Sequence, residues 1–397
     1  MVAVLGADSP IGLTVIRELG EHGIPVLALG RTRQSLGRHS RYASSFAKFE
    51  QPLDEWLPRF LTDHRLSAIL GISEGDLLQL ARLKGRLGAT KVMCPDPDKL
   101  AIVLDKRRTL EVAAQIGIKV PRSWLPRRGE DHAARAAQLD YPVAVKWSDP
   151  PSVVERLKLQ GLELEKVELA ENPGELMAIL DRYQPLGEWP LAQTWCPGYG
   201  LGQMLNMHGG RATLTFQHRR LREWPPSGGV SSLCEAVPLK QHREQMALSE
   251  RLLKEIGWEG PAMVEYRYDP SSDTYWLMEV NGRFWGSMPL AHYAGAHFAW
   301  EYYRCQTQPE AECIQPATRK IRARYVAPDF KHLLAVLGDS SRSAWRRLRF
   351  AMRFFADFAD PRVRYYVWSW RDPLPFLSEM GGIVRKLLRR DTHREGR

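Results

Sequence analysis

The sequence predicts an α/β protein with a small N-terminal doubly wound domain, followed by an α+β domain and a basic helical C-terminal segment. Three observations predict this class. A strand, a helix and a second strand follow one another between Val2 and Leu29. Pairs of apolar strands joined by turns recur between 203 and 281. Arginine and aromatic residues dominate from Pro316 onward. Alternating strands and helices indicate parallel strands, whereas hairpins indicate an antiparallel sheet.

The N-terminal elements have clear hydrophobic periods. The run Val2 to Leu5 is a short apolar strand, and Ile11, Val15 and Leu19 then recur at helical spacing. Further strands are expected at residues 24–29, 68–72 and 91–94. Residues 1–98 are therefore predicted to form one small doubly wound domain.

The second domain is expected over residues 99–304. One helix is predicted from Asp96 through Asp105 and Lys106 to about residue 116. Strands follow at 141–147 and 191–195, around a polar and loosely packed stretch at 150–190. Residues 122–192 are thus expected to form a smaller, lid-like subdomain. Hairpins are predicted at 203–208 with 211–218 and at 262–268 with 274–281.

Composition excludes several classes of protein. The 397 residues are 44% hydrophobic and 26% charged, which is ordinary for a globular chain and unlike a disordered one. Five cysteines show neither CxxC nor zinc spacing, so we expect reduced thiols. The chain shows no apolar leader and no apolar run of membrane-spanning length, so a cytoplasmic protein is expected.

Three oxygen-bearing side chains form the sharpest pattern. Glu279 and Asn281 are two apart on a predicted strand and share a face, and Glu265 lies on the preceding strand of the hairpin. Carboxylate and amide oxygens suit Mg²⁺. The alternative is a solvated acidic face of the sheet.

Three cations accompany this pattern. Arg283 follows Asn281 by two residues, where it can hold an anionic substrate or a developing phosphoryl charge. Lys106 lies on the helix after Asp105. Lys146 ends the apolar strand 142–146, where an anion partner is expected because an unpaired buried ammonium is costly. The alternative for Lys146 is that its ammonium reaches solvent.

A basic cluster precedes the first acidic residue of this pattern. His218, Arg219, Arg220 and Arg222 are followed by the Gly228-Gly229 turn. Strand alternation places Arg220 and Arg222 on one face with His218, where they would bind a substrate carboxylate. Arg220 is the preferred substrate residue, and a solvated basic strand end is the alternative.

These motifs, in this order, resemble the ATP-grasp superfamily, near biotin carboxylase and the large chain of carbamoyl phosphate synthetase. The resemblance covers about residues 1–300 and rests on Asp105-Lys106, the strand ending at Lys146, Cys196-Pro197-Gly198, and the endings Met263-Val264-Glu265 and Met278 to Arg283. It implies a pre-ATP-grasp domain followed by a two-subdomain ATP-grasp fold.

The resemblance also implies roles. Lys106 and Lys146 would hold ATP phosphates, and Glu265, Glu279 and Asn281 would hold Mg²⁺ or Mn²⁺. Arg283 would steady the carboxylate or acyl phosphate. The hinge that reads adenine would be Gln193, Thr194, Trp195 and Cys196, with Gln203 nearest to the ribose.

The implied function is an ADP-forming carboxylate–amine or carboxylate–thiol ligase acting through an acyl phosphate. No catalytic serine elbow, zinc-protease motif or P-loop competes with it. Two alternatives stay open: a nucleotide-dependent oxidoreductase, and a non-enzymatic protein that binds nucleotides or anionic surfaces. No nucleic-acid motif is visible. A homo-oligomer is left open.

The positive charge is concentrated at the C-terminal end. Residues 339–397 contain 14 Lys+Arg against 7 Asp+Glu, so they carry +7 of the total +10. Arginines at 342, 346, 349 and 353 recur beside apolar residues at 345, 348, 352 and 355, and residues 383–390 repeat the pattern. We expect these basic amphipathic helices to pack their apolar faces on the body, with contact to an anionic membrane as the alternative.

Overall fold

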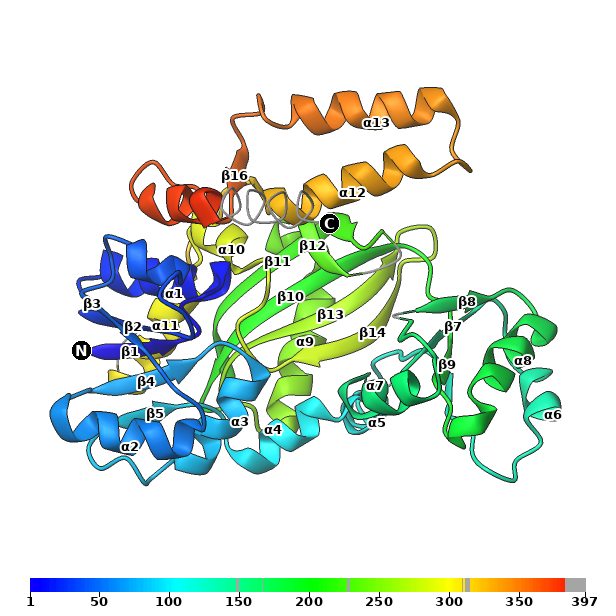
Figure 1. The fold of residues 1–397 in the computed structure, drawn as a ribbon, viewed down its shortest axis with the longest axis horizontal. Coiled ribbons are helices and arrows are strands. Elements are labelled where there is room, and N and C mark those ends of the chain that lie inside the picture. Colours follow the sequence, from blue (N-terminus) through cyan, green and yellow to red (C-terminus); the bar gives the residue numbers. More distant parts are fainter. Residues whose placement is uncertain (148–149, 166, 227–228, 309, 311–314, 383–397) are drawn as a thin grey trace, which may run out of the picture. The chain divides into compact units, whose positions relative to one another are not determined.

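The computed structural model describes residues 1–397 except 148–149, 166, 227–228, 309, 311–314 and 383–397 (Figure 1). The chain forms two units. Unit 1 comprises Met1–Val112, Leu201–Glu265 and Val280–Arg397, and unit 2 comprises Ala113–Gly200 and Tyr266–Glu279. The domain boundaries expected at 98/99 and 304/305 stay predictions. Within the described residues, no helix is both long and apolar enough to cross a bilayer.

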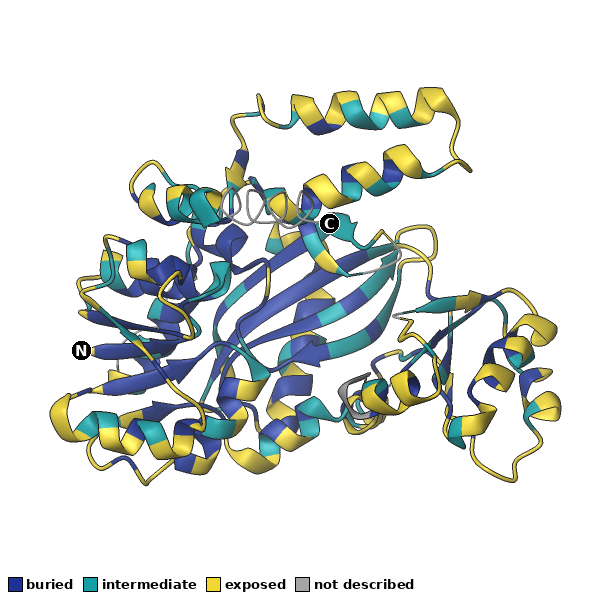
Figure 2. Ribbon diagram, in the orientation of Figure 1, coloured by how far each residue is buried: buried dark blue, intermediate teal, exposed yellow. Residues whose placement is uncertain are grey.

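The N-terminal part of unit 1 is a five-stranded parallel sheet in the order β3-β2-β1-β4-β5, which confirms the doubly wound prediction. Its strands are β1 (Val2–Leu5), β2 (Val26–Gly30), β3 (Ser45–Lys48), β4 (Ala68–Gly71) and β5 (Lys91–Met93). Its helices are α1 (Pro10–Glu21), α2 (Leu53–Asp63) and α3 (Glu74–Leu83), with a 3₁₀ turn, η1, at Leu36–His39. Figure 2 shows the central strands as buried.

The turn between β1 and α1 requires glycine at two positions. Gly6 has φ +103°, and a Cβ on it would lie 2.4 Å from Cγ1 of Ile72. A Cβ on Gly12 would lie 2.2 Å from the Gly6 carbonyl oxygen. The hydroxyl of Ser9 accepts from the Gly12 N–H at 3.1 Å and caps α1. The helix therefore starts in direct contact with the end of the first strand.

The single helix predicted from 96 to about 116 is two helices, α4 (Pro97–Leu104) and α5 (Lys106–Gln115). Asp105 separates them in an extended conformation. Its carboxylate accepts from the backbone N–H groups of Arg107 at 3.0 Å and Arg108 at 3.2 Å. This local capping competes with a continuous helix, so Asp105 starts α5 and sets Lys106 in its first turn.

Unit 2 contains a four-stranded antiparallel sheet in the order β6-β9-β7-β8. The strands are β6 (Ser123–Trp124), β7 (Val143–Lys146), β8 (Glu168–Ala170) and β9 (Leu191–Thr194). The helices are α6 (His132–Ala136), α7 (Pro150–Leu159) and α8 (Pro173–Arg182), with a 3₁₀ turn, η2, at Gln184–Leu186. The stretch expected to be loosely packed contributes Leu157, Leu176 and Leu180 to a buried core. That expectation was wrong because α7 and α8 each present an apolar face.

The third sheet has seven strands in the order β14-β13-β10-β11-β12-β15-β16. They are β10 (Tyr199–His208), β11 (Arg211–Trp224), β12 (Val230–Ala236), β13 (Gly260–Asp269), β14 (Thr274–Asn281), β15 (Arg322–Arg324) and β16 (Val363–Tyr365). The two predicted hairpins are confirmed. The boundary between the units crosses β13 and β14.

Helices of unit 1 accompany this sheet: α9 (Arg243–Ile256), α10 (Met288–Ala294), α11 (Phe298–Thr307), α12 (Val326–Gly338) and α13 (Ala344–Ala356), with a 3₁₀ turn, η3, at Leu239–His242. One hydrophobic core includes β1, α1, β11, α10, α11 and Tyr366. The C-terminal segment is not purely helical, because β15 and β16 extend the sheet beyond β12. The expected helix at 383–390 lies outside the described residues.

The cysteines fit reduced thiols. Cys94, Cys196, Cys234 and Cys305 are buried, and no disulfide occurs among the described residues. Burial raises the pKa of the Cys94, Cys196 and Cys234 thiols to about 11. Such thiols stay protonated at neutral pH and react slowly.

Candidate active site

Arg220 and Glu265 meet on one face of the seven-stranded sheet. Arg220 lies on β11 and Glu265 on β13, with β10 between them. The Arg220 guanidinium donates to the Glu265 carboxylate, and it lies 3.8 Å from the Glu223 carboxylate. The side chains of Arg220 and Glu265 are 14% and 15% exposed. This pair is therefore largely desolvated but still reachable from solvent.

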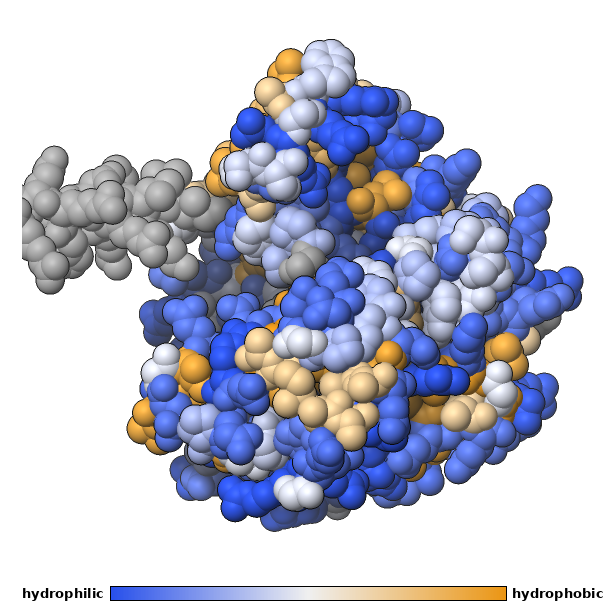
Figure 3. Space-filling model, turned by 90° about the vertical axis from the view of Figure 1, so that its right-hand side faces the viewer, coloured by the Kyte–Doolittle hydropathy of each residue, from blue (hydrophilic) through white to orange (hydrophobic). Residues whose placement is uncertain are grey.

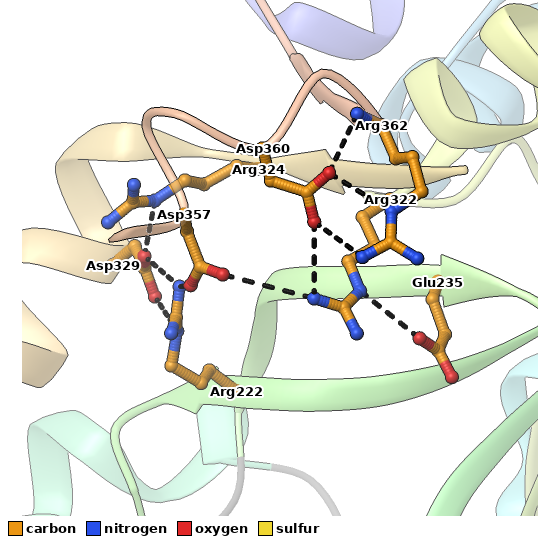
Figure 4. Close-up of polar contacts among 8 residues, drawn as sticks. All are labelled: Arg222, Glu235, Arg322, Arg324, Asp329, Asp357, Asp360 and Arg362. Carbon is orange, nitrogen blue, oxygen red and sulfur yellow. Dashed lines mark hydrogen bonds and ion pairs between the residues drawn. The ribbon is translucent and has the colours of Figure 1, made fainter. Parts of the chain in front are cut away.

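Arg222 does not share the face of Arg220, contrary to the prediction. A β-bulge shifts the register between Arg220 and Arg222, so that Arg220 pairs with Cys234 and Arg222 with Leu233. One extra residue breaks the alternation of side chains along a strand. Arg222 instead donates to Asp329 of α12 at 2.8 and 2.9 Å (Figure 4).

The rest of the predicted basic cluster also has other partners. Arg219 pairs with Glu235 of β12. The His218 imidazole is fully buried, and its Nδ1 lies 3.0 Å from the Ser287 hydroxyl. Burial, with Arg220 nearby, lowers the pKa of His218 to about 3, so it carries no charge at neutral pH. Arg220 is the member of this cluster that the structure places beside a predicted metal ligand. Gly228 of the expected turn lies outside the described residues.

Arg283 ties the end of β14 to the N-terminal sheet. Its guanidinium donates to the Asn281 side-chain oxygen at 3.0 Å, to the Phe284 carbonyl at 3.1 Å and to Glu74 at 3.1 Å. Glu74 opens α3 directly after the cap Ser73. Asn281 is buried, so the contact with Arg283 fixes the direction of its amide. A small pocket beside Arg283 is lined by Gly71, Met93 and Tyr302, among others.

The three predicted metal ligands fall on the expected strands. Glu265 lies on β13 of unit 1, and Asn281 ends β14 in unit 1. Glu279 precedes Asn281 by two residues on β14, at the end of the unit 2 segment. Carboxylate and amide oxygens from neighbouring strands match the donors that Mg²⁺ takes. The contact with Arg220 does not exhaust Glu265, because a carboxylate has about four acceptor sites.

The predicted phosphate lysines lie at element ends. Lys106 is exposed on the first residue of α5. Lys146 ends β7 and is partly buried, and its register partner on β9 is Leu191. Lys106 belongs to unit 1 and Lys146 to unit 2.

The predicted adenine hinge forms the end of β9 and the residues after it. The Gln193 side chain is buried and donates to the Ser123 hydroxyl at 2.9 Å. The Thr194 N–H donates to the Arg122 carbonyl and the Trp195 N–H to the Pro142 carbonyl, both at 2.9 Å. Trp195 is 39% exposed, and Cys196 is buried beside it.

The arginine of β13 completes the surroundings of this hinge. Arg267 donates to the carbonyl oxygens of Cys196, at 3.3 Å, and of Gly198. Its guanidinium carbon lies 5.8 Å from the centre of the Trp195 ring. The exposed indole of Trp195 therefore offers an aromatic surface beside polar backbone groups.

Gln203 was predicted nearest to the ribose, and the structure gives it a different role. Its side chain is fully buried and donates to Gln217 at 3.0 Å and to the His242 carbonyl at 3.2 Å. Its oxygen accepts from the Ser249 hydroxyl of α9 at 2.7 Å. These internal hydrogen bonds hold α9 to the sheet. Gln203 is therefore a structural residue and not part of the candidate site.

Two contact residues escaped the sequence analysis. Glu74, the partner of Arg283, follows the carboxyl end of the parallel strand β4. Ligands of parallel sheets bind at the carboxyl ends of the strands, so this position could have identified Glu74 from the sequence. Glu223 lies beside Arg220 only because of the β-bulge, which no local pattern announces.

No protein-family model and no curated protein matches the sequence. Solved structures do match the fold. The biotin carboxylase domain of the 2-oxoglutarate carboxylase from Hydrogenobacter thermophilus, solved with MgADP, ADP and bicarbonate, is 18% identical with a TM-score of 0.60. That match covers 81% of this chain and 72% of that chain.

Two further solved structures are similar. The L-amino acid ligase from Bacillus licheniformis is 14% identical with a TM-score of 0.55, over 77% of this chain and 73% of that chain. N5-carboxyaminoimidazole synthetase from Staphylococcus aureus complexed with ADP is 15% identical with a TM-score of 0.55, over 74% and 72%. The chain therefore has the ATP-grasp fold, as the sequence motifs predicted.

Proposed function

We propose that this chain is an ATP-dependent, ADP-forming ligase that joins a carboxylic acid to an amine or a thiol through an acyl phosphate. The observation that carries the proposal is the pairing of Arg220 with Glu265 on the sheet whose strand β14 ends at Asn281, with Arg283 bound to Asn281 just beyond that strand. A desolvated arginine beside hard oxygen donors suits a reaction between two anions, a carboxylate and a phosphate. The three solved ATP-grasp structures described above add support.

The residues fit a divalent cation. Glu265, Glu279 and Asn281 would hold Mg²⁺ or Mn²⁺, which would neutralise and orient the ATP phosphates. Lys106 and Lys146 would bind phosphate oxygens. Gln193, Thr194, Trp195 and Cys196 would form the adenine site, with the exposed Trp195 ring and backbone carbonyls as contacts.

In the proposed reaction, an oxygen of the substrate carboxylate attacks the γ-phosphorus of ATP. The bond from that phosphorus to the ADP oxygen breaks, and an acyl phosphate forms. The amine or thiol then attacks the acyl carbon, phosphate leaves, and one proton is released. Arg220 binds the substrate carboxylate. Arg283 has five N–H donors, of which the described contacts use three, so two are left for the acyl phosphate.

No observation favours an oxidoreductase. A dinucleotide pyrophosphate would bind at the N-terminal end of α1. There the Asp8 carboxylate accepts from the Arg31 N–H at 2.9 Å and the Ser35 hydroxyl at 2.5 Å. A carboxylate at this point repels a pyrophosphate.

The test is acid-dependent ADP formation. The chain is incubated with ATP, Mg²⁺, a panel of carboxylic acids and hydroxylamine, which traps an acyl phosphate as a hydroxamate. We expect one class of acid to yield ADP, phosphate and hydroxamate in equal amounts, with Arg219→Met as active as wild type and Arg220→Met at least about 10²-fold slower. Formation of AMP and pyrophosphate with the active acid would contradict the proposal.

A further inference from the structure

A cluster of two histidines and a glutamate lies away from the candidate active site. Glu21 ends α1, His292 lies on α10, and His297 precedes α11. One ligand atom from each lies within 4.8 Å of the others. The nearest measured pair, Nε2 of His292 and a carboxylate oxygen of Glu21, is 4.0 Å apart. Three ligands that are each about 2.0–2.2 Å from one ion lie at most about 4.4 Å apart, so small movements of these side chains would bring two nitrogens and one oxygen onto a transition metal.

Nδ1 of each histidine faces another side chain. Nδ1 of His292 lies 3.6 Å from Glu18, whose carboxylate is fully buried. The other Glu18 oxygen accepts from the Ala299 N–H at 2.6 Å. Nδ1 of His297 lies 3.1 Å from Nε2 of His22. Histidines that ligate metals almost always donate the second ring N–H to a carboxylate, a backbone carbonyl or water, and Glu18 is such a partner for His292.

A second observation points the same way. Nδ1 of His292 and Oε1 of Glu18 are both buried without any hydrogen-bond partner. Two facing polar atoms left unsatisfied in a core are costly. A metal on Nε2 would fix the proton of His292 on Nδ1, which then donates to Glu18. The geometry points to a binding site for a divalent transition metal, such as Zn²⁺, formed by Glu21, His292 and His297 with Glu18 as the positioning residue.

Zn²⁺ binding to the full chain tests this site. The chain is stripped with a chelator and titrated with Zn²⁺ in excess Mg²⁺, against a chromophoric zinc indicator. We expect one Zn²⁺ per chain, about 10²-fold or greater weakening by Glu21→Ala or His297→Ala, and about tenfold or greater weakening by Glu18→Gln. The control is His64→Ala, because His64 is an exposed histidine directly after α2 and belongs to no part of the proposed site.

Co²⁺ provides a second readout that does not depend on affinity. Its visible absorption reports the geometry of the ligands, and we expect a tetrahedral spectrum in the wild type that His297→Ala abolishes. Thermal melting of each variant without metal shows whether it is folded. Absence of stoichiometric Zn²⁺ in the wild type, or wild-type affinity in both ligand variants, would overturn the site.

An independent observation concerns α12 and α13, here called the C-terminal hairpin (Val326–Ala356). Of the 20 large hydrophobic residues that are exposed among the described residues, 12 lie between 330 and 380. At the top of Figure 3, where this hairpin lies, apolar side chains stand beside hydrophilic ones. The apolar face formed by residues 345, 348, 352 and 355 was predicted to pack on the body, and its exposure shows that this was wrong for α13.

Three stripes of side chains run along α13 on different sides of the helix, which has 3.6 residues per turn. One stripe, including Phe350 and Phe354, contacts α12 through His332 and Phe330. The apolar stripe is exposed and consists of Trp345, Leu348, Met352 and Phe355, at 64, 51, 49 and 59%. The arginine stripe consists of Arg342, Arg346, Arg349 and Arg353.

The arginine stripe is largely unneutralised. Arg342 pairs with Asp339 at 2.8 Å. In the described part of the chain, no ion pair involves Arg346, Arg349 or Arg353. No acidic residue occurs between Asp339 and Asp357. An exposed tryptophan, aliphatic residues and adjacent arginines are the composition of a helix that lies in a bilayer interface.

The base of the hairpin is held firmly to the sheet (Figure 4). Asp329 of α12 is fully buried and pairs with Arg222 and with Arg324, the latter at 2.6 Å. The Arg324 guanidinium lies 4.0 Å from the ring centres of both Phe354 and Phe358. The side chains that make these contacts to the sheet are Asp329, Phe354 and Phe358, and the four residues of the apolar stripe are not among them. We propose that the C-terminal hairpin docks on an anionic lipid surface.

Vesicle cosedimentation of the full chain tests this surface. We expect retention on vesicles of phosphatidylglycerol and phosphatidylcholine, and little on phosphatidylcholine alone. The triple variant Arg346→Gln, Arg349→Gln, Arg353→Gln should weaken binding on the order of 10²-fold. Trp345→Ser, Leu348→Ser, Phe355→Ser should weaken it about tenfold or more. All six side chains are exposed, so folding is expected to survive.

The control replaces exposed apolar residues elsewhere: Leu78→Ser, Leu159→Ser, Leu169→Ser. Residues 383–397 are unchanged in every variant, so a difference between variants belongs to the hairpin. Equal retention of the control and the stripe variants would overturn the proposal. Sedimentation without lipid gives a second contradicting outcome. If the wild type is a dimer and the triple serine variant a monomer, the apolar stripe binds a second copy of the chain instead of lipid.

Discussion

Two arginines of β11 lie on either side of a β-bulge and have opposite surroundings. Arg220 pairs with Glu265 at the candidate active site, where both side chains keep about a seventh of their surface exposed. Arg222 pairs with Asp329 below the C-terminal hairpin, where the carboxylate is fully buried. Both are pairs of an arginine and a carboxylate. A ligand from solvent can reach and replace a partner in the pair of Arg220, but it cannot reach the carboxylate that binds Arg222. Burial, rather than residue type, separates a functional ion pair from a structural one.

The largest expected effect is on the structural side. Asp329→Asn leaves the buried Arg324 without its carboxylate and weakens the hold on Arg222, so we expect a loss of about 3–5 kcal/mol in the free energy of unfolding. Denaturant unfolding measures it. Glu265→Gln, the matched change on the open side, should cost less, on the order of 1–2 kcal/mol, because the amide oxygen can still accept from Arg220 and Glu223 lies beside that guanidinium. Equal losses in the two variants would remove the distinction.

The next effect is on activity. Arg220→Met removes the charge that binds the substrate carboxylate, so acid-dependent ADP formation should fall at least about 10²-fold, or about 2.7 kcal/mol in the barrier. The rate of ADP formation at saturating ATP measures it. Rescue by Arg220→Lys should be partial, because an ammonium cannot form the bidentate contact of a guanidinium. A normal rate in Arg220→Met would exclude Arg220 from the reaction.

His218 gives the comparison a pH dependence. The folded protein holds this imidazole neutral, with its pKa lowered to about 3 by burial, whereas the unfolded chain protonates it near 6.5. The unfolded state thus binds more protons between these values, so stability falls as the pH falls from 6.5. His218→Gln should reduce this loss of stability by about 3 kcal/mol between pH 6.5 and pH 4. Unfolding curves at several pH values check the slope, and an unchanged slope would contradict the buried assignment.

The smallest effect is expected at Arg219, which precedes Arg220 on β11 and is the most exposed of the three arginines. Its pair with Glu235 is partly exposed on the Arg219 side, and Glu235 also accepts from Arg322 at 3.2 Å. Such pairs contribute about 0–1 kcal/mol. Arg219→Met should therefore change unfolding by less than about 1 kcal/mol and leave ADP formation intact. A larger change in the free energy of unfolding would show that the exposure of the three arginines does not determine how much their ion pairs contribute to stability.

Local patterns predicted the elements that depend on local sequence. The β1–α1–β2 start and the two hairpins follow from hydrophobic period and turn residues over short stretches. The break between α4 and α5 also depends on local sequence, because the Asp105 side chain caps α5. The sequence analysis missed it because apolar residues recur at helical spacing on both sides of Asp105. The ATP-grasp fold could be predicted because its acidic and basic motifs occur in a fixed order along the chain.

The contacts of the site could not be read in the same way. The β-bulge that separates Arg220 from Arg222 depends on the register with β12, and the internal hydrogen bonds of Gln203 depend on the docking of α9. Both are set by elements that lie far away in the sequence. The exposed stripe of α13 depends on which face α12 covers, and an amphipathic pattern alone does not choose that face.

The most direct test is Mg²⁺-dependent binding of ATP, because it requires no knowledge of the acid or the amine. Isothermal titration compares the wild type with the double variant Glu279→Ala, Asn281→Ala. We expect the wild type to bind ATP tightly only with Mg²⁺, and the double variant to lose at least about tenfold in that affinity while remaining folded. Equal Mg-ATP binding by the two proteins would contradict the assignment of these residues as the metal site.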